Sequence, residues 1–282
     1  MDDHADRRAA KYDIQDIRDT ARGLVERGAE IGVHGIDAWH DPASARQELA
    51  RVSEVTGRKD IGIRSHWLCF DEASPRILEE AGFAYDSTFG YNGAAGFRAG
   101  SLQPFKPLKA KSLLELPLNV QDTSLFNPHH MDLTEPKARQ LCRRLIAKAV
   151  THGGALTFLW HDRSLAPERL YEDFYLGLLS DLQANNAWFA TGGEAAGWYR
   201  QRRSIAFEEV RFEDDAVCVR LLHDGIDIRP APVLRIHIAG AREGGQSGAS
   251  RHREYSADIP CTGERDLRIP IEGIIGKAAS NI

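Results

Sequence analysis

The sequence lacks the features that mark several classes of protein. No apolar run reaches the ~18 residues that a membrane-spanning helix needs, so we expect no membrane span. Residues 1–11 are polar and charged, so we expect neither a secretory signal peptide nor export from the cytoplasm. The four cysteines lie far apart without a CxxC pair, which is typical of reduced thiols in a cytoplasmic protein.

Two further absences argue against particular classes of function. The formal net charge is −5, which gives no electrostatic argument for binding a nucleic acid. No GxSxG segment is present and no cysteine has the setting of a nucleophile, which argues against a metal-free α/β hydrolase. The chain has 282 residues, of which 42% are apolar, so it can form one large domain or a medium domain with a small appendix.

The first 200 residues alternate between helix and strand patterns. Apolar residues recur at helical spacing, glycines follow several of these segments, and short apolar runs lie between them. The predicted helices are 14–28, 42–57, 74–82, 134–153, a segment through 170–178, and one starting at Thr191, where TGGE has capping-box spacing. The predicted strands are 29–34, 61–65, 83–87, 113–120, 155–161 and 187–191, and 88–112 is predicted as a long structured loop.

This alternation predicts a parallel β/α domain over residues 1–203. Beyond residue 203, apolar residues alternate with a period of two, as at Val217, Val219 and Leu221 and again at Ile226 and Ile228. Residues 204–282 are therefore predicted to form a small accessory domain of the β-sandwich type. Within it, 241–250 is a flexible polar loop and 267–271 a further strand.

Ionisable side chains follow four of the predicted strands. In parallel β/α folds the functional site lies at the carboxyl ends of the strands, so these residues would meet at one rim. They are His34 and His40, then Arg64, His66 and Asp71 beside Trp67, then Asp122, and finally His161 and Asp162 beside Trp160.

Five segments resemble the NodB-homology polysaccharide deacetylase family, especially the branch that acts on bacterial envelope and exopolysaccharide sugars. In order they are EIGVHGIDAWH, GIRSHWLCFD, LEEAGFAYDSTFGYNGAAGFRAGSLQPF, LLELPLNVQDTSLF and LTFLWHD, and the resemblance as a whole covers roughly residues 12–200. The third segment is the most specific. The resemblance implies an α/β fold, an incomplete distorted (β/α) barrel, and metal-dependent hydrolysis of an N-acetyl or N-formyl group on a sugar.

In that family a divalent ion, held by two histidines and an aspartate, polarises the acyl carbonyl and activates water. The resemblance assigns His34 and His40 as metal ligands. The family's two histidines lie closer together than these two, which makes His66 an alternative ligand. Zn²⁺ is the expected ion because imidazole suits it. The resemblance also assigns Arg64 as the arginine that orients the catalytic aspartate, and His161 as the acid that protonates the leaving amine.

Five further residues are expected to line the substrate site: Trp67, Asp71, Asp122, Trp160 and Asp162. Each site residue also has a purely structural interpretation. The histidines can be hydrogen-bonded loop residues, the tryptophans can pack in the core, and the aspartates can cap loops or helices. Arg64 can pair with Asp71 or Asp86, and we expect a salt bridge between Asp86 and Arg98 that holds the loop at 88–104.

The aspartate pair of the family lies on its first strand, and no apolar run able to form that strand precedes Glu30. A strand–helix–strand unit needs about 30 residues, and helix 14–28 takes half of those available. We therefore expect the first strand and its carboxylates to be missing, with an open sheet edge in their place. Asp2-Asp3-His4 imitates the acidic motif without a strand to hold it. Either the sequence starts too late or the protein is a remnant.

The predicted function is hydrolysis of an N-acyl group on a cell-envelope or exopolysaccharide sugar, with an N-acylated sugar or polysaccharide precursor as the partner. The reaction would be lost without the aspartate pair. The alternative is a non-catalytic carbohydrate-binding protein derived from a deacetylase. Alanine at His161 separates the two, because only the enzyme loses turnover.

Overall fold

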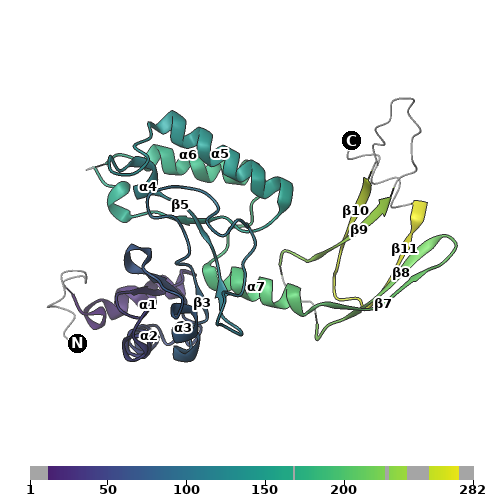
Figure 1. The fold of residues 1–282 in the computed structure, drawn as a ribbon, viewed down its shortest axis with the longest axis horizontal. Helices are drawn as coiled ribbons and strands as arrows, with labels where there is room; N and C mark the ends of the chain where they lie inside the picture. The colour runs from purple at the N-terminus through teal and green to yellow at the C-terminus, as the bar shows by residue number, and fades with distance from the viewer. Residues whose placement is uncertain (1–11, 168, 226–228, 240–253, 273–282) are drawn as a thin grey trace. The chain divides into compact units, whose positions relative to one another are not determined.

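The computed structural model describes residues 12–167, 169–225, 229–239 and 254–272. The chain divides into two compact units, residues 1–196 and 197–282. The division falls within helix α7 (Gly192–Ser204) (Figure 1). The predicted boundary after residue 203 lies at the end of the same helix. The predictions for Asp2-Asp3-His4, for Ile226 and Ile228 and for loop 241–250 fall outside the described residues.

The first half of the N-terminal unit alternates short strands with helices. Its elements are η2 (Ile14–Ile17), α1 (Arg18–Glu26), β1 (Val33–Gly35), α2 (Pro42–Thr56), β2 (Ile63–Ser65), η3 (His66–Leu68), α3 (Ser74–Ala81) and β3 (Tyr85–Asp86). Helix α2 shows why these boundaries fall where they do. Asp41 accepts a hydrogen bond from the backbone of Ser44 at 2.7 Å, Pro42 opens the first turn, and Gly57 ends the helix in the left-handed conformation.

The second half continues the alternation. Its elements are β4 (Leu114–Glu115), β5 (Leu118–Gln121), α4 (Asp122–Phe126), α5 (Glu135–His152), β6 (Thr157–Leu159), η4 (Asp162–Ser164) and α6 (Glu172–Ala184). Strands β1-β2-β3-β4 form one parallel sheet, and β5 and β6 form a second parallel pair. Helices α5 and α6 lie side by side (Figure 1) and pack with β5 and β6 around buried Leu125 and Phe174.

The chain is thus a mixed α/β protein, as the alternation predicted. The described strands form open sheets rather than a closed barrel, with β1 and β6 at sheet edges. The segment 155–161 was predicted to be buried on both faces, but Thr157–Leu159 are only half-buried because β6 is an edge strand.

Two other local predictions were wrong. Residues 187–191 do not form a strand, because no neighbouring strand among the described residues pairs with them, and Trp188 and Phe189 are 44% and 50% exposed. The strand 113–120 is two strands, since Pro117 has no backbone N–H to continue the ladder. The capping box is confirmed, because Thr191 and Glu194 exchange hydrogen bonds of 2.8 and 3.2 Å.

The C-terminal unit is built from antiparallel strands, as the period of two predicted. They are β7 (Ala206–Phe212), β8 (Ala216–Leu222), β9 (Val233–Ala239), β10 (Glu254–Pro260) and β11 (Asp266–Pro270). Strand order is β11-β8-β7 in one sheet and β10-β9 in the other, and one apolar cluster contains residues of both sheets, Val219 and Leu234 among them. Strand β11 confirms the strand predicted at 267–271.

Candidate functional site

Four of the predicted site residues converge where parallel strands end. His34 lies on β1 directly opposite Arg64 on β2. His66 follows β2, and its ring centroid lies 5.0 Å from that of His34 at an interplanar angle of 69°. His161, which follows β6, lies close enough to His34 to lower the pKa of that imidazole. The strand ends therefore bring together side chains from widely separated parts of the sequence.

His34 is held in the neutral form by this environment. Desolvation, together with the positive charges that His66, Arg64 and His161 can carry, lowers its pKa to about 4. A hydrogen bond to the backbone of Arg64 opposes the shift only in part. The residue nevertheless keeps contact with solvent. A neutral, solvent-accessible imidazole is able to bind a metal ion or accept a hydrogen bond at neutral pH.

Asp122 and His161 form the best-defined pair of the site. Nδ1 of His161 lies 2.6 Å from Oδ1 of Asp122, and the backbone N–H of His161 donates to Oδ2 at 3.0 Å. The hydroxyl of buried Ser164 also donates to Oδ2. Burial raises the pKa of Asp122, but the hydrogen bonds from His161 and Ser164 outweigh it and hold that pKa below its usual range. The ionised carboxylate thus fixes the imidazole and leaves its Nε2 available for proton transfer.

Helix α4 places Asp122 for this pair. The residue follows β5 directly, at the first position of the helix, and the carboxylate is fully buried. The sequence indicated Asp122 by its place after a strand, but the short helix gave no signal because it spans only five residues.

Arg64 is half-buried and holds the backbone behind the histidines. Its Nε and Nη2 donate to the backbone oxygen and the hydroxyl of Ser87, at 2.9 and 2.8 Å. It neighbours two buried carboxyl groups, Asp86 and Glu115, which are hydrogen-bonded to each other. Burial raises the pKa of both carboxyls, that of Glu115 well above its usual range. Each carboxyl therefore takes up a proton more readily than it would in water, and the arginine charge lies beside the pair.

Glu115 was missed by the sequence analysis. It lies in the apolar run LLELPL, where an isolated acidic residue on a buried strand is the signal that could have found it. The predicted salt bridge between Asp86 and Arg98 does not form. Asp86 accepts hydrogen bonds from Thr88, whereas Arg98 donates to the backbone oxygen of Gly90 at 2.8 Å.

An exposed aromatic residue borders the histidines. Trp67 is 63% exposed and stacks against His66 with ring centroids 4.6 Å apart. Its backbone is left-handed, with φ of 57°, and that of Leu68 is too, with φ of 55°. Two consecutive bulky residues in this region are strained, which is characteristic of functional sites. Nearby, Asn92 donates to the backbone oxygen of Trp67 at 3.5 Å.

A second exposed aromatic residue belongs to the same rim. Gln121, next to Asp122, donates to the backbone oxygens of Tyr91 and Asn92 at 3.1 and 3.0 Å. The segment 91–92 therefore lies between Trp67 and the Asp122–His161 pair. Tyr91 is 44% exposed, and the sequence analysis did not include it because it lies in the long loop.

Four predicted site residues make contacts that serve local structure. They are His40, Asp71, Trp160 and Asp162. His40 is exposed, stacks on Trp39 with ring centroids 4.3 Å apart, and lies near the carboxylates of Asp41 and Asp71. Asp71 accepts hydrogen bonds from the backbone of Ala73 and Ser74 at the start of α3.

The other two are Trp160 and Asp162. Trp160 stacks on Phe174 and Tyr175 in the core between β6 and α6, at 5.8 and 5.2 Å. Asp162 is exposed and accepts a hydrogen bond from the backbone of Arg163 at 2.7 Å.

The donors for a metal ion are incomplete in the described part of the chain. His34 and His66 are suitable nitrogen ligands, but the described residues contain no group of three or more His, Cys, Asp or Glu side chains that could hold an ion. Imidazole alone can bind Zn²⁺, and structural or catalytic sites use at least three protein ligands. The residues present therefore fit a divalent ion only in part.

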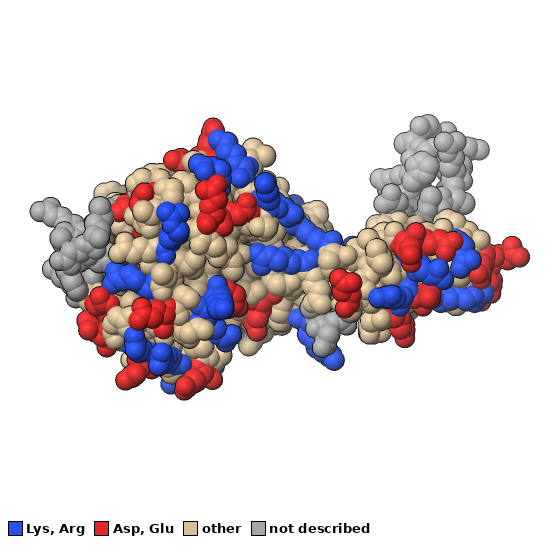
Figure 2. All heavy atoms as spheres, turned by 90° about the horizontal axis from the view of Figure 1, so that it is seen from below, with Lys and Arg blue, Asp and Glu red and all other residues tan. Residues whose placement is uncertain are grey.

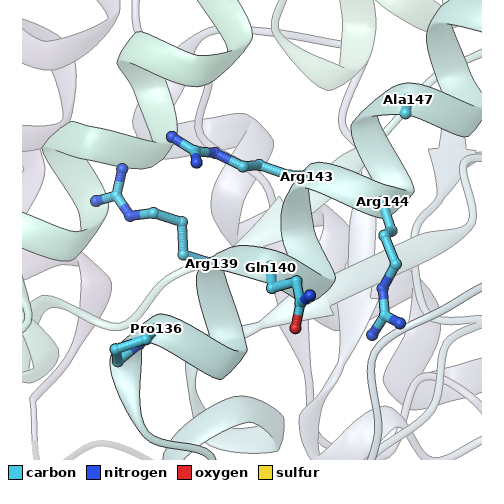
Figure 3. A pocket seen from close by; sticks show the side chains of 6 residues that line it. All are labelled: Pro136, Arg139, Gln140, Arg143, Arg144 and Ala147. Atoms are coloured by element: carbon cyan, nitrogen blue, oxygen red, sulfur yellow. The ribbon is translucent and has the colours of Figure 1, made fainter.

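A hollow on the surface of α5 is a weaker candidate for the functional site. It is lined by Pro136, Arg139, Gln140, Arg143, Arg144 and Ala147 (Figure 3). Arg143 is bound to Asp181 by two hydrogen bonds of 3.0 Å, and Arg139 lies 3.5 Å from the same carboxylate. These two arginines join α5 to α6, which gives them a structural role.

Comparison with known proteins leaves the family open. No protein-family model matches the chain, and no curated protein is significantly similar to it. None of the helices in the described part is long and apolar enough to cross a membrane.

Proposed function

We propose that the chain is a hydrolase that removes an N-acetyl or N-formyl group from a cell-envelope or exopolysaccharide sugar, built on a domain of the polysaccharide deacetylase type. The observation that supports this most is the Asp122–His161 pair at 2.6 Å, located at the same strand ends as His34 and His66. A histidine oriented by a buried carboxylate is the arrangement that proton transfer in amide hydrolysis requires.

In this proposal His161 donates a proton from Nε2 to the amine that leaves when the C–N bond breaks. Asp122 holds the ring through Nδ1 and stabilises the imidazolium form before the transfer. Arg64 acts through the framework, because both of its hydrogen bonds are to Ser87. Trp67 and Tyr91 offer flat apolar surfaces on which the face of a sugar ring can stack.

His34 and His66 are the residues that would hold a divalent ion, Zn²⁺ being the best match to imidazole. When bound, such an ion polarises the acyl carbonyl and activates water. The neutral state of His34 suits this role, since a protonated imidazole cannot bind a metal.

The alternative is a carbohydrate-binding protein without catalysis. It is favoured by the exposed Trp67 and by the incomplete set of metal donors in the described residues. In that case the Asp122–His161 pair would only stabilise the junction of β5 and β6.

One experiment distinguishes the two functions. N-acetylated and N-formylated oligosaccharides are incubated with the wild type and with His161→Ala, with and without Zn²⁺, and both the free amine and glycan binding are measured. The exposed His129→Ala is the matched control. The hydrolase predicts turnover that falls about 10²- to 10⁴-fold in His161→Ala alone, with binding retained. Binding without turnover in either protein contradicts it and supports the binding protein.

A further inference from the structure

The outer strand of the C-terminal unit presents a row of large apolar side chains to solvent. Strand β7 lies at the end of the sheet β11-β8-β7, and each of its residues is exposed. Phe207, Val210 and Phe212 are 63%, 49% and 80% exposed. An edge strand with unpaired backbone groups and exposed apolar side chains is a site for pairing with another strand.

The register of the sheet shows that this row continues its buried face. Each of the three residues lies opposite a buried residue of β8, and directly opposed residues point to the same face. The pairs are Phe207 with Leu221, Val210 with Val219 and Phe212 with Val217. An irregularity between Phe207 and Glu209 leaves Glu208 as the extra residue, which brings Phe207 onto the same face as Val210.

The opposite face of the same strand carries charge. Glu209 and Arg211 lie on it, 3.3 Å apart between Oε1 and Nε, and Arg220 of β8 pairs with Asp266 of β11 beside them. Figure 2 shows acidic and basic side chains interleaved over this unit. The two faces of β7 therefore differ: one is apolar, and the other is charged and well solvated.

We propose that β7 pairs in antiparallel register with β7 of a second copy of this chain, across a two-fold axis at Val210. In this register Glu209 faces Arg211 of the partner subunit, and Arg211 faces Glu209 of the partner subunit. The extra residue Glu208 brings Phe207 opposite Phe212 of the partner subunit. Each pair joins residues of the same face, so the two sheets become one sheet with a continuous apolar face.

The pattern of the strand favours a second copy over another partner. When the strand is reversed against itself about Val210, with Glu208 left out as the extra residue, Glu209 meets Arg211 on one face and Phe207 meets Phe212 on the other, in both halves of the interface. A parallel arrangement in the same register would instead place Glu209 opposite Glu209 and Arg211 opposite Arg211, which repel. This inference does not depend on the proposed hydrolase.

The test is the mass of the full chain in solution, measured by sedimentation over a range of concentrations. The wild type is expected to move from the mass of one chain to twice that mass as concentration rises. Val210→Lys brings two positive charges together at the axis and is expected to remain monomeric. Val233→Lys is the control, because Val233 is an exposed valine, at 52%, on the other sheet. A monomeric wild type, or a dimer that Val210→Lys leaves unchanged, overturns the proposal.

A charge exchange tests the register itself. Glu209→Arg and Arg211→Glu are each expected to weaken association at least 10-fold, because each creates like-charge pairs across the axis. The double variant Glu209→Arg/Arg211→Glu is expected to restore it. Association that stays weak in the double variant contradicts this register.

Covalent capture covers the case in which a charged variant fails to fold. Val210→Cys is expected to form a disulfide-linked dimer on mild oxidation, since opposed Cα atoms in an antiparallel pair lie about 4.5–5.5 Å apart. The wild type, whose Cys69 and Cys218 are partly exposed, gives the background. Cross-linking no greater than this background overturns the proposal.

Discussion

Nδ1 of His161 lies 2.6 Å from Oδ1 of Asp122, and the two side chains come from the ends of neighbouring parallel strands, β6 and β5. The carboxylate is fully buried and the imidazole is 35% exposed. The buried carboxylate orients the ring, and the exposed part of the ring is the part that a substrate can reach.

The first prediction concerns Asp122→Asn. Asparagine removes the ionised carboxylate that orients the ring of His161, so we expect turnover to fall about 10²- to 10⁴-fold if the pair is catalytic. The folded-state pKa of Asp122 is depressed, so its contribution to stability is present above the unfolded pKa and is lost as pH falls through the folded value. Thermal melts should therefore show the variant less stable than the wild type at pH 7, with a difference that shrinks at strongly acidic pH. A constant difference would show that the charge is irrelevant.

The second prediction concerns the protonation of His34, whose pKa is lowered to about 4. In the unfolded chain a histidine gains its proton near pH 6.5, whereas His34 in the folded protein stays neutral until about pH 4. Its contribution therefore makes the folded state less stable as pH falls from 6.5 towards 4. In NMR titrations the His34 ring should show no protonation between pH 8 and 5. Protonation of His34 near pH 6.5 would contradict this environment.

The third prediction concerns the buried carboxyl pair, tested by Glu115→Gln. The pKa of Glu115 is raised well above 4.5 in the folded protein, so stability falls as pH rises from about 4.5 towards the folded-state value. Glutamine keeps the acceptor for the backbone of Phe89 and removes this loss. The melting temperature of the variant should exceed that of the wild type at pH 8 and approach it near pH 4. An advantage that does not grow with pH would be evidence against a raised pKa of Glu115.

The fourth prediction concerns the loop that carries Tyr91. The guanidinium of Arg98 lies 4.8 and 4.7 Å from the ring centroids of Phe70 and Phe89, and donates a hydrogen bond to Gly90. We expect Arg98→Ala to lower the free energy of unfolding by about 1 kcal/mol, since exposed cation–π contacts are modest.

Urea denaturation of Arg98→Ala is compared with that of Arg76→Ala, which removes only an exposed helical ion pair with Glu80. The control should change stability by less than about 0.5 kcal/mol. Equal effects of the two variants would show that Arg98 does not hold the loop.

The sequence predicted those parts of the fold that depend on local signals. Helix α2 begins at Pro42 behind Asp41 and ends before Gly57, as the caps indicated. The strand predicted at 187–191 was wrong. The segment AWFAT has strand propensity, but a strand forms only where another strand pairs with it. No local pattern contains that information.

The sequence predicted the residues of the site but not their arrangement. His34, His66, Asp122 and His161 were found because each lies at or just after the end of a strand, and parallel strands end at one edge. Their mutual distances, and the hydrogen bond between Asp86 and Glu115, depend on how strands far apart in the sequence pack, so the sequence did not reveal them.

The most direct test of the proposed hydrolase is the mass of a defined N-acylated oligosaccharide after incubation with the wild type and with His161→Ala. The proposal predicts that the wild type produces a sugar lighter by one acyl group and that His161→Ala leaves the substrate intact while still binding it. If the wild type binds the oligosaccharide and its mass never changes, with or without Zn²⁺, the chain is a binding protein and the Asp122–His161 pair is structural.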